Sequence, residues 1–135
     1  MLTVAKRPCG SCPYRKDAPS GIWAREEYEK LPLYDGPTSE QTFAIFMCHQ
    51  RDGNLCAGWL ACHGPWELLA LRIARLRNEV DPVVMSYTTD VPVFASGACA
   101  HAHGVRDLKK KTPRAIKMLR GLWKKRNDPK KARRA

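Results

Sequence analysis

Two cysteines near the start of the chain, Cys9 and Cys12, are separated by two residues. Thiolate sulfur is a preferred ligand of zinc and of iron–sulfur clusters. This spacing lets two sulfurs bind one metal centre from a single tight turn, and Gly10 favours such a turn. The pair therefore supplies half of a four-ligand site, and the other half must come from elsewhere in the chain.

The second half of the site has eight candidates, which are Cys48, Cys56, Cys62, Cys99, His49, His63, His101 and His103. We favour Cys48, which follows the apolar run 43–47, and Cys56, which follows a turn and begins a short helix, so that its sulfur can point back towards Cys48. Cys62 lies about 600° of helical rotation beyond Cys56. Cys62 and His49 are the substitute ligands.

The favoured ligand set suits either a structural zinc ion or a [4Fe–4S] cluster. Zinc motifs often contain two C-x-x-C pairs, and this chain has one. Proline directly after a ligand cysteine, as at Pro13, is typical of iron–sulfur motifs. Structural zinc sites are the more frequent class, so we expect Zn²⁺ as the cofactor, with a [4Fe–4S] cluster as the alternative.

Two other interpretations of the cysteines remain. Free cysteine is among the most often buried residue types, so Cys62 and Cys99 are expected to fill space in the core. A C-x-x-C pair can also cycle between dithiol and disulfide. Such redox pairs usually begin a helix after a strand, whereas Pro8 and Pro13 flank this pair. Redox chemistry is therefore the less favoured interpretation.

Motifs of nucleophilic enzymes, glycine-rich phosphate loops and HExxH are absent from the sequence. A catalytic zinc would need three protein ligands and an open position. Histidine beside a structural site more often lies outside the ligand set. We therefore predict a non-enzymatic protein, with a catalytic metal as the weaker alternative.

The positive charge of the chain is concentrated at its C-terminal end. The net charge is +11, and residues 1–105 carry 10 Lys/Arg and 11 Asp/Glu, whereas residues 106–135 carry 14 and 2. Such basic arms most often contact nucleic acid through its phosphates. The cations expected to do so are Lys109, Lys110, Lys111, Arg114, Lys117, Arg120, Lys124, Lys125 and Arg126. The alternative is a solvated basic helix that aids solubility.

Short helices and irregular loops are expected to position these residues. Helices are predicted at residues 23–31, 56–63, 66–78 and 97–103, with a short one beginning near Thr38 and a long one beginning at Thr112-Pro113. The run 43–47 suits a buried strand or a helix, because periodicity does not separate the two in so short a run. Residues 79–94 are expected to be loop with at most a short element.

The last helix has an apolar stripe and a basic face. Ile116, Leu119, Leu122 and Trp123 recur at helical spacing, so we expect them to dock on the body of the domain. Trp123 could stack on a base, although its spacing favours a core anchor. From Asn127 onwards the polar, basic chain is expected to fray.

The predicted fold class is mainly α with irregular loops and at most one small β element. We expect a metal-stabilised single domain, with a cysteine-rich part at 1–105 and a basic C-terminal helix and tail at 106–135. Ten prolines, nine glycines and 27% charged residues leave few long apolar runs, so a metal would help folding. No signal peptide or membrane span is recognisable, which predicts a cytoplasmic protein with reduced thiols and no membrane contact.

Four blocks of sequence, in order, resemble the signature of a family of small, uncharacterised cysteine-rich proteins of actinobacteria and their phages. The blocks are Cys9-Gly-Ser-Cys-Pro-Tyr-Arg15, Asp17-Ala-Pro-Ser-Gly-Ile-Trp23, Met47-Cys-His-Gln50 and Cys56-Ala-Gly-Trp-Leu-Ala-Cys-His-Gly64. The resemblance covers about residues 7–105. It implies a compact domain whose recurring cysteines match Cys9, Cys12, Cys48 and Cys56, with Cys99 outside the pattern. It implies no activity.

A weaker resemblance is to the WhiB-type iron–sulfur regulators, which combine four cysteines, a Gly-Val-Trp turn and a basic segment that contacts DNA. Gly21-Ile-Trp23 and residues 106–135 are similar, but the order of cysteines and turn differs.

The leading prediction is a non-enzymatic metal-binding protein that contacts nucleic acid or the transcription machinery. The alternatives are an iron–sulfur redox sensor or enzyme, and a phage-encoded protein that binds a host protein. In the leading prediction the metal site is scaffolding, and the contact surface lies at the other end of the chain.

Overall fold

The structure, a computed structural model, describes residues 1–128. Over that range it contains five α-helices, four 3₁₀ helices and one two-stranded sheet, which confirms the predicted fold class. The α-helices are α1 (Arg25–Glu29), α2 (Ala57–His63), α3 (Leu69–Leu76), α4 (Gly97–Val105) and α5 (Pro113–Arg126). The 3₁₀ helices are η1 (Leu31–Tyr34), η2 (Thr38–Glu40), η3 (Pro65–Glu67) and η4 (Pro82–Ser86). Each helix in residues 1–128 is too short or too polar to span a bilayer.

The small sheet joins the N-terminus to the middle of the chain. Strand β1 (Thr3–Val4) pairs in parallel with β2 (Asn54–Leu55), with Thr3 opposite Asn54. An antiparallel bridge from Met47 to Leu55 makes residues 47–55 a hairpin-like loop. Residues 43–47 therefore form neither a helix nor a named strand, and Met47 alone is in a bridge.

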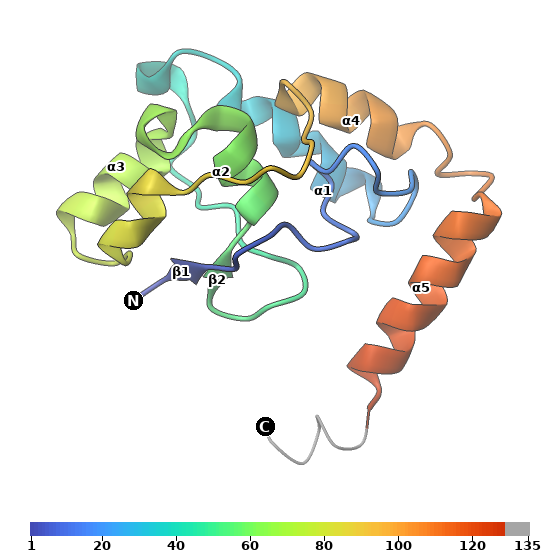
Figure 1. The fold of residues 1–135 in the computed structure, drawn as a ribbon. Helices are drawn as coiled ribbons and strands as arrows, with labels where there is room; N and C mark the ends of the chain where they lie inside the picture. The colour runs from blue at the N-terminus through green and yellow to red at the C-terminus, as the bar shows by residue number, and fades with distance from the viewer. Residues whose placement is uncertain (129–135) are drawn as a thin grey trace.

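The core surrounds α2, which lies near the middle of the body, with α3 on one side and α1 and α4 on the other (Figure 1). Trp59 and Leu60 of α2 are fully buried. Further fully buried side chains belong to the same core, including Tyr14, Leu31, Leu55, Leu68, Leu71, Val80 and Val84. Gly64 ends α2 as expected and adopts a left-handed φ of 80°.

The helix expected over 66–78 is instead two pieces, η3 and α3. Leu68 between them is extended, and the side chain of Gln41 makes the missing hydrogen bonds. Its Nε2 atom donates to the Glu67 carbonyl at 3.0 Å, and its Oε1 atom accepts from the Leu69 N–H at 3.1 Å. A side chain from a distant loop therefore replaces the intrahelical bonds at this point.

The first helix is shorter than the predicted 23–31 because a tyrosine hydroxyl binds the residues before it. Tyr28 Oη accepts hydrogen bonds from the N–H groups of Ile22 at 3.0 Å and Trp23 at 3.2 Å. Gly104 of α4 packs so closely on the Tyr28 ring that a Cβ atom there would overlap it. This contact fixes the loop that carries Trp23.

Helix α4 begins where the sequence predicts, with two acceptors at its N-terminus. Ser96 Oγ accepts from the Cys99 N–H at 3.1 Å. The carboxylate of Asp35 accepts from the N–H groups of Gly97 at 2.7 Å and Ala98 at 2.8 Å. Together these bonds satisfy donors that the first turn of a helix leaves open.

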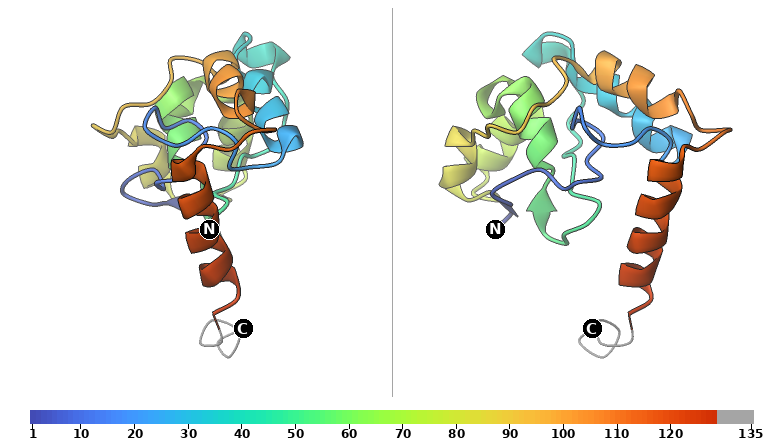
Figure 2. Two further views of the ribbon diagram at one scale, coloured as in Figure 1. Left: turned by 90° about the vertical axis from the view of Figure 1, so that its right-hand side faces the viewer. Right: turned by 45° about the vertical axis from the view of Figure 1, so that its right-hand side comes forward.

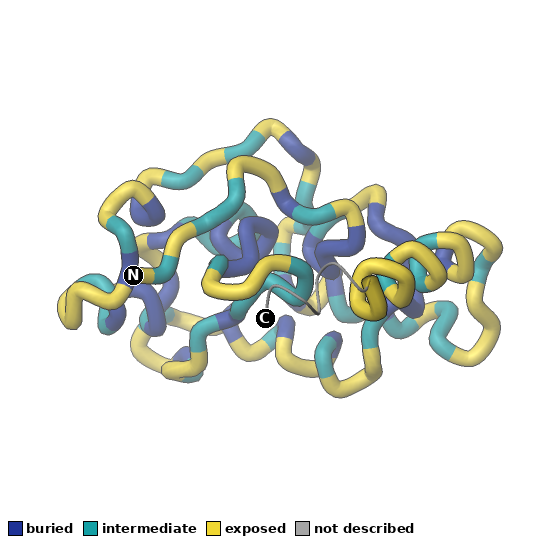
Figure 3. The backbone as a smooth tube through the Cα atoms, turned by 90° about the horizontal axis from the view of Figure 1, so that it is seen from below, coloured by how far each residue is buried: buried dark blue, intermediate teal, exposed yellow. Residues whose placement is uncertain are grey.

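Helix α5 begins at the predicted cap, where Thr112 Oγ1 accepts from the Ala115 N–H at 3.2 Å. It then projects away from the body (Figures 1 and 2). The expectation that its apolar stripe docks on the body is wrong at two positions, since Ile116 is 40% and Trp123 is 67% exposed. Ala115 is the buried residue of the described part of α5, and most of the helix surface is exposed (Figure 3).

Candidate metal centre

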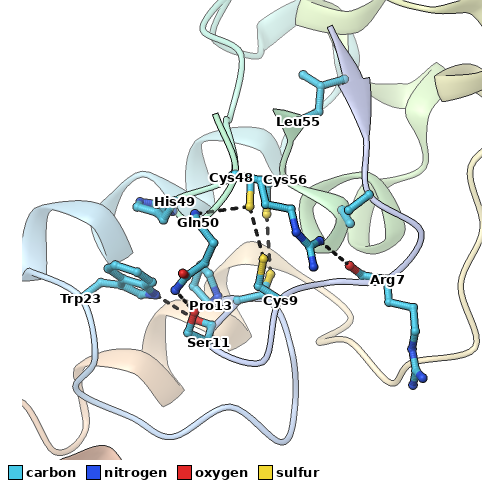
Figure 4. Close-up of a pocket in the computed structure, with 14 residues that line it drawn as sticks. Arg7, Cys9, Ser11, Pro13, Trp23, Cys48, His49, Gln50, Leu55 and Cys56 are labelled. Carbon is cyan, nitrogen blue, oxygen red and sulfur yellow. Dashed lines mark hydrogen bonds between the residues drawn. The ribbon is translucent and has the colours of Figure 1, made fainter. Parts of the chain in front are cut away.

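Four cysteine sulfurs lie together beside the N-terminal loop, in two pairs (Figure 4). The Sγ atoms of Cys9 and Cys48 are 3.3 Å apart, and those of Cys12 and Cys56 are 3.6 Å apart. Both separations are far longer than a disulfide bond, and all four cysteines are free. The four residues are those expected from the sequence to act together.

The loop that carries the first two cysteines is a tight turn. The Cys12 N–H donates to the Cys9 carbonyl at 2.9 Å. The guanidinium of Arg15 donates to the Pro8 carbonyl at 2.9 Å, which links the residues on either side of the turn. Both sulfurs therefore leave the turn on the same side.

The other two cysteines sit on the hairpin-like loop at 47–55 and at the start of α2. The Cys48 N–H donates to the Asn54 carbonyl at 2.8 Å, and the Cys56 N–H donates to the Phe46 carbonyl at 3.0 Å. These bonds pair the two arms of the loop. They bring Cys48 and Cys56 to one end of the loop although eight positions separate them in the sequence.

The two sulfurs of each pair are hydrogen-bonded, and their pKa values move in opposite directions. The hydrogen bond from Cys9 and the N–H groups of Gln50 and Arg51 lower the pKa of Cys48 to about 5. The hydrogen bond to Cys48, followed by burial, raises the pKa of Cys9. These contacts therefore favour the anionic form at Cys48 over Cys9.

The deeper pair, Cys12 and Cys56, is hydrogen-bonded in a similar way. The hydrogen bond from Cys56, aided by the N–H groups of Tyr14 and Gly58, lowers the pKa of the Cys12 thiol. Burial, followed by the hydrogen bond to Cys12, raises the pKa of Cys56. Backbone N–H groups thus already point at the sulfurs, as they do around metal-bound thiolates.

The cavity that all four cysteines line has a volume of about 10 Å³. That is close to the space needed by one water molecule. Within residues 1–128, no group of three or more Cys, His, Asp or Glu side chains is placed so that it could hold a metal ion as it stands. The centre is therefore two thiol pairs around a small space, and its sulfurs would have to shift to bind an ion.

The comparison with known families supplies one match. The model of a family of unknown function (DUF6283) matches residues 4–120. The chain belongs to this family. No curated protein and no solved structure matches the chain.

The DUF6283 match extends beyond the 7–105 expected from the sequence blocks. It includes all four clustered cysteines. It also reaches the middle of α5, so the first half of the basic helix belongs to the family region together with the cysteine centre.

Polar contacts surround the centre on the side of the Cys9–Cys12 turn. Gln50 Nε2 donates to Ser11 Oγ at 2.7 Å, and Trp23 Nε1 donates to the Ser11 carbonyl at 2.9 Å. His49, a substitute ligand, stacks on Trp23 with ring centroids 4.6 Å apart, and its Nε2 atom lies 2.8 Å from a carboxylate oxygen of Glu27. The sequence could have signalled Ser11 and Gln50, which neighbour the cysteines, but nothing signalled Glu27.

The remaining cysteines lie outside this cluster. Cys62, the other substitute ligand, is half-buried and does not line the cavity. Burial, followed by the nearby charges of Asp35 and Cys99, raises its pKa to about 12. Cys99 is exposed on α4, so the expectation that it fills space in the core is wrong.

Two other histidines, His63 and His103, contact residues of the body. His63 is half-buried beside the rings of Tyr14 and Tyr34, with centroids 5.7 and 6.0 Å away. His103 Nε2 lies 2.7 Å from the Ala18 carbonyl. Neither residue lines the cysteine cavity.

The nine cations expected to contact nucleic acid are all exposed. Two of them also fasten the start of α5 to the body, since Lys111 Nζ donates to the Gly21 carbonyl at 2.7 Å and Arg114 donates to the Asp17 carbonyl at 2.6 Å. Gly10 faces Met118, whose Cε atom lies 4.0 Å from the position of a Cβ on that glycine. The basic helix and the cysteine centre, which lie far apart in the sequence, are therefore neighbours in space.

Proposed function

We propose that this protein binds one structural zinc ion through Cys9, Cys12, Cys48 and Cys56, is not an enzyme, and contacts nucleic acid through α5. The observation that carries the proposal is the convergence of four free sulfurs from two distant segments on one small space. Free thiols are kept reduced in the cytoplasm, which is the compartment we infer.

Sulfur spacing favours one ion over a cluster. With Zn–S bonds of about 2.3 Å, the sulfurs of a tetrahedral site are roughly 3.8 Å apart. The two separations of 3.3 and 3.6 Å lie close to that value. A [4Fe–4S] cluster binds each thiolate to a different iron, which spreads the sulfurs much further and needs far more space than about 10 Å³.

Charge gives a second argument for a metal. The deeper pair is formed by Cys12 and Cys56, which are 5% and 3% exposed, and hydrogen bonds lower the pKa of the Cys12 thiol, which favours its anionic form. Burying an anion among apolar side chains is costly unless a counter-charge is present. A divalent cation between the pairs supplies that counter-charge and replaces the remaining thiol protons.

The nucleic-acid part of the proposal rests on α5. Its six cations are Arg114, Lys117, Arg120, Lys124, Lys125 and Arg126, and the helix contains no acidic residue. Because α5 projects from the body, most of these side chains can reach phosphates without moving the fold (Figure 2). Such contacts give affinity that depends strongly on salt and little on sequence.

The metal is tested by elemental analysis and a visible spectrum of protein purified without air. We expect one zinc per chain and a colourless protein, with zinc lost from Cys9→Ser, Cys12→Ser, Cys48→Ser and Cys56→Ser. The exposed Cys99→Ser is the matched control and should keep its zinc. A brown protein that oxygen bleaches would instead establish the iron–sulfur alternative.

Nucleic-acid contact is tested by the salt dependence of oligonucleotide binding. Lys124→Gln/Lys125→Gln should weaken binding and flatten the slope of log K against log salt by about 0.7 for each single-strand phosphate that is no longer neutralised. The control removes two cations elsewhere, Arg75→Gln/Arg77→Gln. Equal slopes for the two double variants would overturn the role of α5, and a complete lack of binding would favour a protein partner of the kind expected for a phage-encoded protein.

A further inference from the structure

A large cleft separates α5 from the body and runs past the cysteine centre. Its volume is about 1410 Å³. One wall is α5 from Ile116 to Arg126. The opposite wall contains Trp23 and parts of the two loops that carry Cys9 and Cys48. Those loops contribute Cys9, Ser11 and His49. Figure 2 shows α5 standing off from these loops after its first turn.

The α5 wall combines an aromatic ring with positive charge. Trp123 lines the cleft with 67% of its surface exposed. Four cations of the same helix line it as well, and Arg51 faces them from the loop of the body. The acidic side chains on the cleft are Glu27 and Asp52, and the Glu27 carboxylate is already bound by His49 and by Lys30 at 3.0 Å. The cleft is therefore positive overall.

The spacing of these groups places charge on both sides of the indole. Arg120 lies three residues before Trp123, and Arg126 lies three residues after it. Positions three apart on a helix are neighbours on one face, with Cβ atoms about 5–6 Å apart. A flat, apolar group held against Trp123 would therefore have a cation at each edge.

We propose that this cleft binds a single strand of nucleic acid, with a base stacked on Trp123 and the flanking phosphates paired with α5 cations and Arg51. The inference rests on the proposed function and specifies which form of nucleic acid is bound and where it binds. Grooves that bind single strands combine positive charge with aromatic side chains on which bases stack. The cleft joins these two features on one helix.

Size and stacking decide between the alternative ligands. Small-molecule pockets measure roughly 300–1,000 Å³, and this cleft exceeds that range, so its dimensions suit a polymer. Bases inside a duplex are stacked on one another and present no free face to an indole. A duplex would therefore use the cations of α5 and leave Trp123 without a role.

The test compares the affinities of the zinc-loaded chain for labelled oligonucleotides of about 12 residues, measured by fluorescence anisotropy. The probes are oligo(dT), oligo(U) and a duplex of the same length at one salt concentration. We expect one of the single strands to bind more tightly than the duplex. Trp123→Ala should weaken single-strand binding about 5- to 150-fold, which is the effect of removing one stacked base, and Trp123→Phe should recover most of it.

The chain offers a matched control in Trp66, which is 57% exposed and does not line the cleft. Trp66→Ala should bind single strands like the unaltered protein. A preference for the duplex, or equal affinities for Trp123→Ala and Trp66→Ala, would overturn the single-strand site. If that happens while Lys124→Gln/Lys125→Gln still weakens binding, the proposed function stands and this inference fails; if no probe binds, both fail.

Discussion

The sulfur of Cys12 occupies the space that a Cβ atom on Gly58 would fill. The same Cβ would also lie 2.8 Å from the Cβ of Tyr14. The Gly58 N–H meanwhile helps to lower the pKa of the Cys12 thiol. The second residue of α2 therefore both makes room for the deep pair of sulfurs and binds one of them.

Gly58→Ala is therefore expected to lower the free energy of unfolding by about 1–3 kcal/mol, as overpacking of a core usually does. It should also lower zinc affinity, because Cys12 has to shift. Urea unfolding and competition with a chromophoric chelator measure the two effects. Gly121→Ala is the control, since nothing lies within 4 Å of a Cβ there, and it should stabilise α5. Unchanged zinc affinity in Gly58→Ala would contradict the role given to this glycine.

Tyr28→Phe should cost about 1–3 kcal/mol in the free energy of unfolding, because the N–H groups of Ile22 and Trp23 lose their acceptor in a buried site. Urea denaturation measures the loss. Tyr87→Phe is the matched comparison, since the Tyr87 hydroxyl donates to the Lys6 carbonyl at an exposed position. A smaller loss of unfolding free energy is expected for Tyr87→Phe. Equal losses would contradict the prediction that the hydrogen bonds to Tyr28 stabilise the fold more than an exposed one does.

His63 is expected to make stability depend on pH. Burial lowers its pKa below the ordinary value of 6.5, with Asp35 opposing the shift. As the pH falls below 6.5, the unfolded chain binds a proton at this position that the folded chain does not, so stability is lost on acidification. The loss is at most about 1.4 kcal/mol per pH unit.

His63→Phe should remove this contribution, while an aromatic ring remains against Tyr14 and Tyr34. Urea unfolding of both proteins between about pH 7 and pH 5 measures it. The difference between the two curves isolates His63, because the cysteine centre titrates in both. Parallel curves would contradict the prediction.

Zinc removal should weaken oligonucleotide binding, because the loops through Cys9 and His49 form one wall of the cleft. A chelator-treated sample is expected to bind oligo(dT) less tightly, and added zinc should restore the affinity. Cys99→Ser, whose cysteine is exposed and outside the cluster, should respond like the unaltered chain. Equal binding with and without zinc would show that the two sites act independently.

Local signals were sufficient for the ends of several elements and for the turn that carries Cys9 and Cys12. Ser96 and Thr112 cap their helices through their own side chains, and Gly64 ends α2 with a left-handed φ. Such contacts span only a few residues and can be inferred from sequence. The spacing of Cys9 and Cys12 likewise depends on a single turn.

Contacts between distant residues were the ones that sequence reasoning missed. Gln41 splits the helix expected over 66–78 from 28 positions away, and no periodicity in that segment indicates it. The stack of Trp23 on His49 and the bond from His49 to Glu27 also join separate segments. The apolar spacing of α5 predicted a buried face, but amphipathicity does not reveal whether the chain itself supplies a partner for that face.

The sulfur pairs join residues 39 and 44 positions apart. At a ribosomal rate of roughly 5–20 residues per second, about 2–9 seconds pass between the synthesis of the first cysteines and that of their partners. Nascent chains therefore present the Cys9–Cys12 turn without its counterpart and exposed to oxidants. The proposed zinc site can therefore be completed only after Cys56 has been made, and its yield should depend on how reducing the cell is while the chain is being made.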